Sequence, residues 1–94
     1  MQYLLLIYGE ESAWADISPE RASEIMQAYF AYTDKLKNAG VYLAGDELDV
    51  VAKAKSVRGV GGTHVVDGPF VDTKETLGGY YLIQCASEDE ALNW

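Results

Sequence analysis

The segment Val65–Cys85, VVDGPFVDTKETLGGYYLIQC, contains the features that decide the fold. It opens with β-branched valines and an Asp-Gly-Pro turn at 67–69, and it ends in a Gly-Gly pair followed by an apolar run. The apolar run predicts a strand over 77–85. Tyr80 and Tyr81 alternate within it, so we expect their side chains on opposite faces of the sheet. Four polar side chains at 72–75 separate the turn from this strand.

The segments before this run alternate between strand and helix patterns. Residues 2–8 form a continuous apolar run, which predicts a strand buried on both faces. Ser18 is the expected N-cap of a long helix with Pro19 at its first position, and Gly40 is the expected residue just after its end. A shorter strand is expected over 41–44. Gly45 breaks it, and the alternative is a continuation over 46–51 after a bend. Another strand is expected over 53–58.

The end of the chain adds a hairpin and a second helix. Glycines at 59, 61 and 62 predict a hairpin turn whose return strand covers 63–66. Ser87 and Glu90 form a capping-box pattern that begins a helix. The order strand, helix, strands, helix predicts one α+β domain over 1–94, a ferredoxin-like split βαβ unit that lacks its final strand. We expect that the natural chain continues past Trp94.

Composition excludes several classes of partner. The net charge is −8, with seven Lys and Arg against fifteen Asp and Glu, which disfavours nucleic acid and anionic membrane surfaces. The apolar start is too short to span a membrane, and no basic segment precedes it. Cys85 is the single cysteine, so no internal disulfide can form. These features predict a cytoplasmic protein.

The run DGPF at 67–70, followed by TKE at 73–75 and LGGYY at 77–81, resembles the DGPF-domain family within the YCII-related proteins. The opening YLLLIY at 3–8 and AGV at 39–41 also match the layout of that family. The resemblance covers nearly the whole chain. It implies a ferredoxin-like α+β unit that pairs into homodimers of the dimeric α/β-barrel type. It also implies a complete second helix and a final strand.

The resemblance implies two kinds of function. Many members have no established activity, which suggests a small ligand-binding or accessory module. Some relatives are lyases or dehalogenating enzymes that use a His–Asp pair, and Tyr29 occupies the position that matches their histidine. Asp67 would then be the acid. The alternative is therefore a cofactor-independent lyase or isomerase that uses Asp67 as general base on a small acid, such as a cyclic unsaturated one, with Tyr29 or Lys74 assisting.

Each candidate residue also has a structural interpretation. Asp67 can accept backbone N–H groups of its own turn, or it can take a proton from a substrate. Lys74 and Glu75 can form a charged turn, or Lys74 can hold an anionic ligand. His64 lies three residues before Asp67, so the two face opposite sides of a regular strand, and a dyad would need a bulge. A surface histidine is the favoured interpretation.

The tyrosines are the remaining candidates. Tyr29, Tyr80 and Tyr81 can each pack in the core or line a ligand cavity, where Glu75 and His64 would be further contacts. A single His and a single Cys predict no metal site, and no phosphate or dinucleotide motif predicts a cofactor. The leading hypothesis is a dimeric module that binds a small molecule without a cofactor, with neither nucleic acid nor membrane as a partner.

Overall fold

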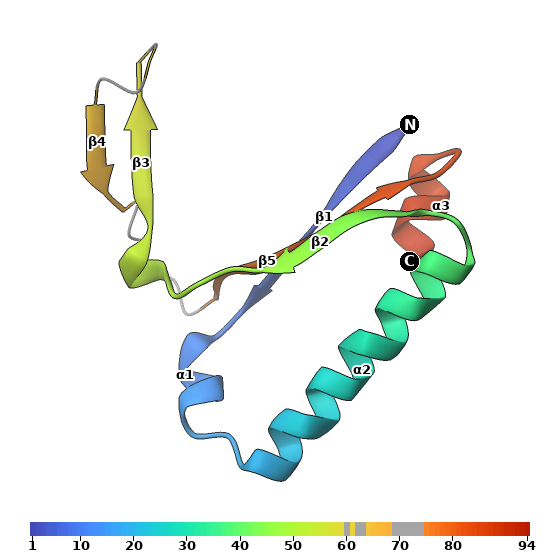
Figure 1. Ribbon diagram of the computed structural model, residues 1–94, viewed down its shortest axis with the longest axis horizontal. Coiled ribbons are helices and arrows are strands. Elements are labelled where there is room, and N and C mark those ends of the chain that lie inside the picture. Colours follow the sequence, from blue (N-terminus) through green and yellow to red (C-terminus); the bar gives the residue numbers. More distant parts are fainter. Residues whose placement is uncertain (60, 62–63, 69–74) are drawn as a thin grey trace.

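The computed structural model describes residues 1–59, 61, 64–68 and 75–94 (Figure 1). Its fold class is α+β, as the sequence predicts. Three strands form the main sheet, two form a separate hairpin, and the helices lie to one side. In chain order the elements are β1 (Gln2–Gly9), α1 (Glu11–Ala15), α2 (Pro19–Asn38), β2 (Tyr42–Glu47), a 3-10 turn η1 (Val51–Lys53), β3 (Lys55–Arg58), β4 (His64–Asp67), β5 (Thr76–Gln84) and α3 (Glu88–Asn93).

The main sheet has the strand order β1-β5-β2. β5 is antiparallel to both neighbours, so β1 and β2 run parallel to each other with β5 between them. The helix α2 connects these two parallel strands, which is the split βαβ arrangement of a ferredoxin-like unit. The strand predicted over 77–85 is therefore the central strand of the sheet. Cys85, which follows it, is buried as expected for a small hydrophobic residue.

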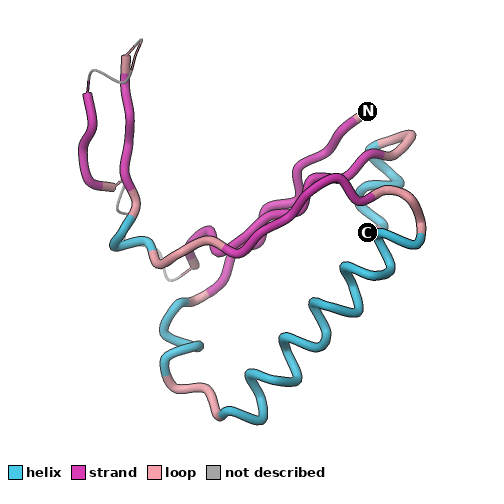
Figure 2. Tube along the Cα trace, in the orientation of Figure 1, coloured by secondary structure: helices cyan, strands magenta, loops and turns pink. Residues whose placement is uncertain are grey.

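The prediction that β1 is buried on both faces is wrong. Burial alternates along the strand: Leu5 and its same-face neighbours are partly buried, whereas Leu4, Leu6 and Tyr8 are 56%, 48% and 56% exposed. The reason is that α2 covers only one face of the sheet (Figure 2). Continuous apolar character did not distinguish a strand covered on two faces from one with an open apolar face.

The helix α2 begins and ends where the sequence predicts. The Ser18 side chain accepts a hydrogen bond from the Arg21 N–H at 3.2 Å, Pro19 is the first helical residue, and Gly40 has the positive φ of +75° typical of the residue after a helix. Leu36, near the C-terminal end, is the buried residue of this helix. Toward its N-terminus the helix diverges from the sheet, so the two are close at one end and apart at the other (Figure 1).

The core lies at the closed end of this wedge. Among the described residues the buried apolar side chains are few and come from α2, β5, α3 and the connections between them: Leu36, Val41, Ile83, Cys85 and Ala91. The short helix α3 is capped by Ser87, whose hydroxyl accepts the Glu90 N–H at 3.2 Å. The Glu90 carboxylate reaches back to the Ala86 N–H at 3.0 Å, one residue earlier than in a standard capping box.

The hairpin of β3 and β4 projects away from the main sheet (Figure 2). Its existence confirms the prediction from the glycines, although residues 51–53 form a 3-10 turn rather than the start of the strand. Gly45 does not break its strand, because β2 runs through it to Glu47. The strand expected over 53–58 begins at Lys55, because Lys53 belongs to η1.

Candidate ligand-binding cavity

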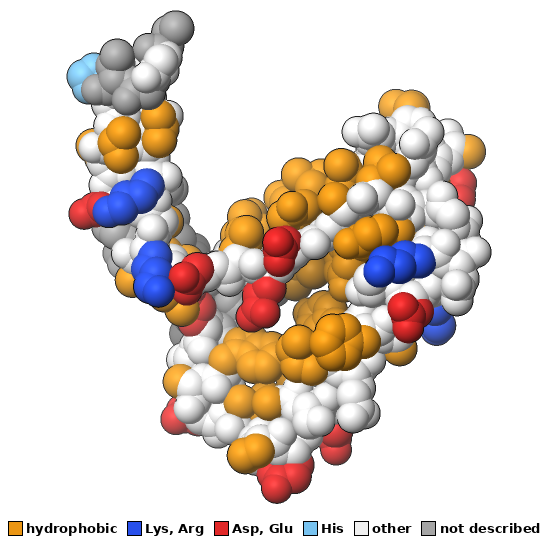
Figure 3. All heavy atoms as spheres, viewed as in Figure 1, with side chains coloured by type: hydrophobic (Ala, Val, Ile, Leu, Met, Phe, Trp, Pro, Cys, Tyr) orange, Lys and Arg blue, Asp and Glu red, His pale blue; other side chains and the backbone are white. Residues whose placement is uncertain are grey.

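A cavity of about 510 Å³ occupies the open end of the wedge between α2 and the sheet. Figure 3 shows the hollow, with hydrophobic side chains around it and acidic ones beside it. The helix α2 supplies Met26, Tyr29, Phe30 and Thr33 as one wall, and α1 supplies Trp14. The floor is the face of β5, β2 and β1 that α2 covers. The cavity exists because the N-terminal part of α2 diverges from this face.

Two glycines in the floor allow neighbouring groups to approach closely. A Cβ atom at Gly45 would lie 2.8 Å from the Tyr81 Cδ1 atom and 3.0 Å from the Tyr80 carbonyl oxygen. A Cβ atom at Gly79 would lie 3.0 Å from the Asp46 carbonyl oxygen. Gly79 thus permits close approach of a backbone, as glycines in strands often do, whereas a Cβ atom at Gly78 would lie 3.9 Å from the Ile7 carbonyl oxygen, an ordinary contact distance. At Gly79 that backbone belongs to β2 of the same chain.

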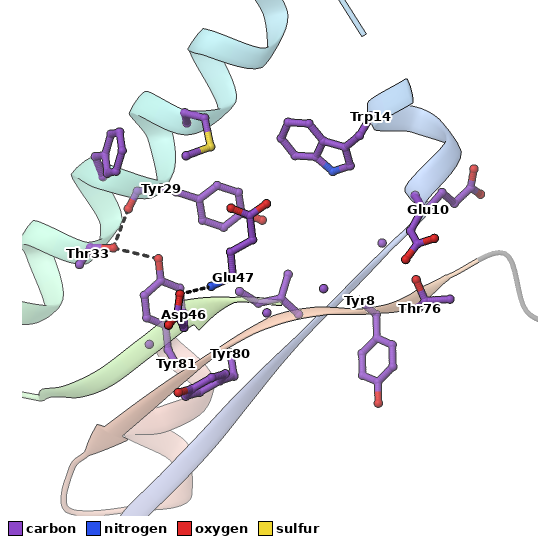
Figure 4. Close-up of a pocket in the computed structure, with 18 of the residues that line it drawn as sticks. Tyr8, Glu10, Trp14, Tyr29, Thr33, Asp46, Glu47, Thr76, Tyr80 and Tyr81 are labelled. Atoms are coloured by element: carbon purple, nitrogen blue, oxygen red, sulfur yellow. Dashed lines mark hydrogen bonds between the residues drawn. The ribbon is translucent and has the colours of Figure 1, made fainter. Parts of the chain in front are cut away.

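Tyr81 is a polar group of the floor whose hydroxyl is hydrogen-bonded to α2. Its hydroxyl lies 2.8 Å from the Thr33 Oγ1 atom, and that Oγ1 atom donates its own proton to the Tyr29 carbonyl oxygen at 2.8 Å (Figure 4). Because Thr33 has only one hydroxyl proton, Tyr81 must be the donor to Thr33. The Tyr81 oxygen is then left with acceptor capacity.

The bond between Thr33 and Tyr81 should couple α2 to the sheet. Combining Thr33→Val with Tyr81→Phe should reveal a coupling energy of about 0.5–1.5 kcal/mol, the usual net value of a hydrogen bond. Urea denaturation of the two single variants and the double variant measures it. Thr33→Val combined with Tyr3→Phe is the control. The Tyr3 hydroxyl contacts the Met1 sulfur instead, so this pair should be additive. Additivity of the first pair would contradict the assigned bond.

Aromatic contacts hold Tyr81 from its other side. The Tyr32 ring meets it edge-on at a centroid distance of 5.3 Å, and the Tyr42 ring does so at 6.4 Å. The Lys37 Nζ atom lies 5.2 Å from the centre of the Tyr42 ring, in a cation–π contact. The Tyr32 hydroxyl donates to the Trp94 carbonyl oxygen at 2.9 Å, which ties α2 to the end of α3.

Burial, with a smaller contribution from Tyr81, raises the pKa of Tyr32 above its ordinary value of 10.0. Folding therefore favours the protonated phenol, and the stability that this contributes is complete below pH 10 and lost as the pH rises through the raised value. The difference in free energy of unfolding between the wild type and Tyr32→Phe should accordingly fall above pH 10. Urea denaturation on both sides of that pH measures this. A difference that grows with pH would contradict the assignment.

The charges around the cavity are mostly negative. Its described lining residues include four acids and one base: Glu10, Glu11, Asp46, Glu47 and Lys37. Two of the carboxylates have backbone partners, since Glu11 accepts the Val51 N–H at 2.8 Å and Asp46 accepts the Glu47 N–H at 2.9 Å. Among the residues that the structure describes, no three His, Cys, Asp or Glu side chains gather in a way that would hold a metal ion.

The structure brings some of the predicted site residues together and separates others. Tyr29 and Tyr81 both line the cavity. Tyr80 contributes to the same stretch of floor, but its ring points to the opposite face of the sheet from Tyr81, as the alternation predicts (Figure 4). Glu75 is exposed just before β5 and is not among the lining residues. Lys74 lies outside the described residues.

Asp67 and His64 lie on the hairpin, outside the cavity lining. The Asp67 carboxylate forms an ion pair with Lys55 on the neighbouring strand, and both side chains are more than half exposed. Pairing of β4 with β3 runs without a shift from His64 opposite Arg58 to Asp67 opposite Lys55. No bulge therefore brings His64 and Asp67 to one face, which a dyad within one chain would require.

Replacing Asp67 by asparagine should change the free energy of unfolding by less than about 1 kcal/mol, because exposed ion pairs contribute little. Urea denaturation of Asp67→Asn, Lys55→Met and the double variant measures the pair directly. The Asp67 side chain is 67% exposed and the Lys55 side chain 59% exposed. A loss of several kcal/mol from Asp67→Asn alone would mean that its carboxylate has a structural role that the surface ion pair does not explain.

Sequence reasoning missed several residues of the cavity. Met26, Phe30 and Thr33 of α2 line the cavity, although none of them is a candidate in the sequence. Trp14 lies on α1 and also lines the cavity. Glu47 had no signal in the sequence, because its place in the cavity depends on how far α2 diverges from β2.

The fold and cavity define a class: a small α+β domain of split βαβ topology, with an aromatic cavity between its helix and its sheet. Among the described residues, none of the helices is both long and apolar enough to cross a bilayer. The chain belongs to the YCII-related family, whose family model matches residues 1–94. It is 40% identical over 95 residues to an uncharacterised protein of Rhizobium meliloti (strain 1021), covering 100% of this chain and 77% of that protein.

Proposed function

We propose that this chain is a dimeric module that binds a small molecule in the cavity between α2 and the sheet. The observation that carries the proposal is the cavity itself, whose volume of about 510 Å³ falls within the usual range of roughly 300–1,000 Å³ for ligand pockets. Its walls are largely aromatic, and a few polar groups converge on it, which is the usual composition of such pockets.

A second copy is the occupant that fits the open face of the sheet. The chain exposes 7245 Å², whereas a folded monomer of 10.3 kDa exposes roughly 5,400 Å². Its radius of gyration is 16.0 Å against roughly 12 Å for a compact chain of this length. Leu4 and Leu6 of β1 are exposed on that face, and their partners on the neighbouring strand β5 are Leu82 and Tyr80. The stripe carries no charge, so a second copy can cover it with the same apolar residues.

Sedimentation equilibrium tests the dimer. We expect twice the chain mass of 10.3 kDa for the wild type and for Leu92→Glu, a 76% exposed leucine of α3. Leu6→Glu should be monomeric, because it places a charge in the middle of the open face. A monomeric wild type, or equal behaviour of the two variants, would contradict the dimer or its interface.

Binding is tested by titrating indole, a neutral probe, into protein labelled with nitrogen-15 and following the amide signals. The shifts should gather around Trp14, Phe30 and Tyr81. Phe30→Ala should weaken binding, and Leu92→Ala, outside the cavity, should not. Shifts that gather elsewhere, or equal effects of both variants, would contradict binding in this cavity.

The structure supports the binding module more directly than the lyase or isomerase. The carboxylate expected to act as general base, Asp67, faces Lys55 on the hairpin and is not among the residues that line the cavity. A general base must lie within hydrogen-bond reach of its substrate. Tyr29 and Tyr81, the other candidates at the cavity, provide a wall and a hydrogen-bond acceptor.

A further inference from the structure

We infer that the cavity between α2 and the sheet selects a small organic cation, a primary ammonium group attached to an apolar body. This inference rests on the proposed function, because it names the class of ligand that the same cavity takes. Three properties of the lining carry it: aromatic walls, hydrogen-bond acceptors, and an excess of carboxylates. Glu47 contributes to both the second and the third property, and all three favour the same ligand chemistry.

The aromatic walls come from separate elements. Trp14 of α1 and Tyr29 of α2 extend into the same space, and Glu47 reaches into it from β2 (Figure 4). Phe30 is also part of the lining and is 62% exposed, so its ring is available to a ligand. Aromatic faces carry negative partial charge and attract ammonium groups within about 6 Å. Lys37 already makes this contact with Tyr42 at the edge of the cavity.

Two polar groups of the lining can accept hydrogen bonds, so they suit a ligand that donates them. The Tyr81 hydroxyl proton is directed to Thr33, so its oxygen presents acceptor capacity to a ligand. A carboxylate such as Glu47 accepts hydrogen bonds and donates none when ionised. A primary ammonium group has three donors and no acceptor, and it therefore complements both groups. An anionic or purely accepting ligand would leave them without partners.

The balance of charge determines the sign of the ligand. Four acids and one base line the cavity among the described residues, and the base, Lys37, is engaged with the Tyr42 ring. A carboxylate ligand would meet repulsion from these four acids. The acids do not converge in the way that a metal ion needs, as the described residues contain no such group. A larger cation with an apolar body can instead place its charge near Glu47 and its body between Trp14 and Tyr29.

The test compares three probes of one shape that differ in charge: 2-phenylethylammonium, 2-phenylethanol and phenylacetate. Isothermal titration calorimetry on the full chain at neutral pH should show the ammonium binding about tenfold more tightly than the alcohol, and the carboxylate binding weakest. The advantage of the ammonium over the alcohol should shrink at about 1 M salt, where the screening length falls to about 3 Å.

Matched variants locate the effect. Glu47→Gln should reduce the affinity for the ammonium by about three- to tenfold and leave the alcohol nearly unchanged, because it removes one charge and keeps the shape. Glu20→Gln is the control, since it removes the same charge from an exposed position of α2 outside the cavity. Equal loss from both variants would overturn the inference, because general attraction to an acidic chain would then explain the preference.

Other outcomes separate this inference from the proposed function. Equal binding of the three probes, or tightest binding of the carboxylate, would overturn the preference for a cation while the cavity remained a binding site. If neither these probes nor indole shifted the amide signals around Trp14 and Tyr81, both the proposed function and the inference would fail.

Discussion

Leu36→Ala should lower the free energy of unfolding by about 2–5 kcal/mol, which is a large part of the roughly 5–15 kcal/mol that stabilises a typical domain. Leu36 is 0% exposed and lies at the closed end of the wedge, where α2 meets β5 and α3. Removing its side chain takes away apolar contacts and leaves a cavity that its neighbours cannot fill completely. Urea denaturation followed by circular dichroism measures the loss.

The matched control is Leu92→Ala, which makes the same change in a helix. Leu92 is 76% exposed, so its truncation removes little buried surface and should cost less than about 0.5 kcal/mol. Leu36→Met keeps nearly the same volume and should cost less than about 1.5 kcal/mol, which gives a folded reference if the alanine variant is too unstable to measure. Equal losses from Leu36→Ala and Leu92→Ala would contradict the position of the core.

Gly45→Ala should lower the free energy of unfolding by about 1–3 kcal/mol and weaken binding in the cavity. The added Cβ atom would lie 2.8 Å from the Tyr81 ring and 3.0 Å from a backbone oxygen, so the ring has to move. Tyr81 is held by Thr33 and by the Tyr32 ring, and its displacement disturbs both contacts. Denaturation measures the stability, and the titration with indole measures the binding.

Gly9→Ala is the control for Gly45→Ala. A Cβ atom at Gly9 would meet nothing within 4 Å. Alanine also restricts the unfolded chain, which stabilises a protein by about 0.4–1 kcal/mol where the native conformation accepts it. Gly9→Ala should therefore be neutral or slightly stabilising. If Gly45→Ala behaved in the same way and left the Tyr81 signals unchanged, the close contact between β2 and Tyr81 would be contradicted.

Part of the candidate site followed from the sequence. The alternation of Tyr80 and Tyr81 on opposite faces followed from the sequence, but which of the two faces α2 was left open. The structure places Tyr81 on β5 and Tyr29 on α2, and both line the cavity. Asp67 was a stronger candidate than Glu47 because it lies in an unusual motif, yet the structure places Asp67 on a projecting hairpin and Glu47 in the cavity lining. An unusual motif marks the family, but it does not show which carboxylate the tertiary fold directs inward.

The sequence by itself determined the local elements: the cap and first turn of α2, the hairpin at the glycines, and the central strand β5. These depend on backbone preferences and on residues within a few positions of one another, so they can be read from the chain. Only the tertiary structure decided that α2 diverges from the sheet, that one face of β1 stays open, and that Thr33 meets Tyr81, 48 positions away. Such features depend on packing between distant segments, where the size of a side chain at one position sets the space at another.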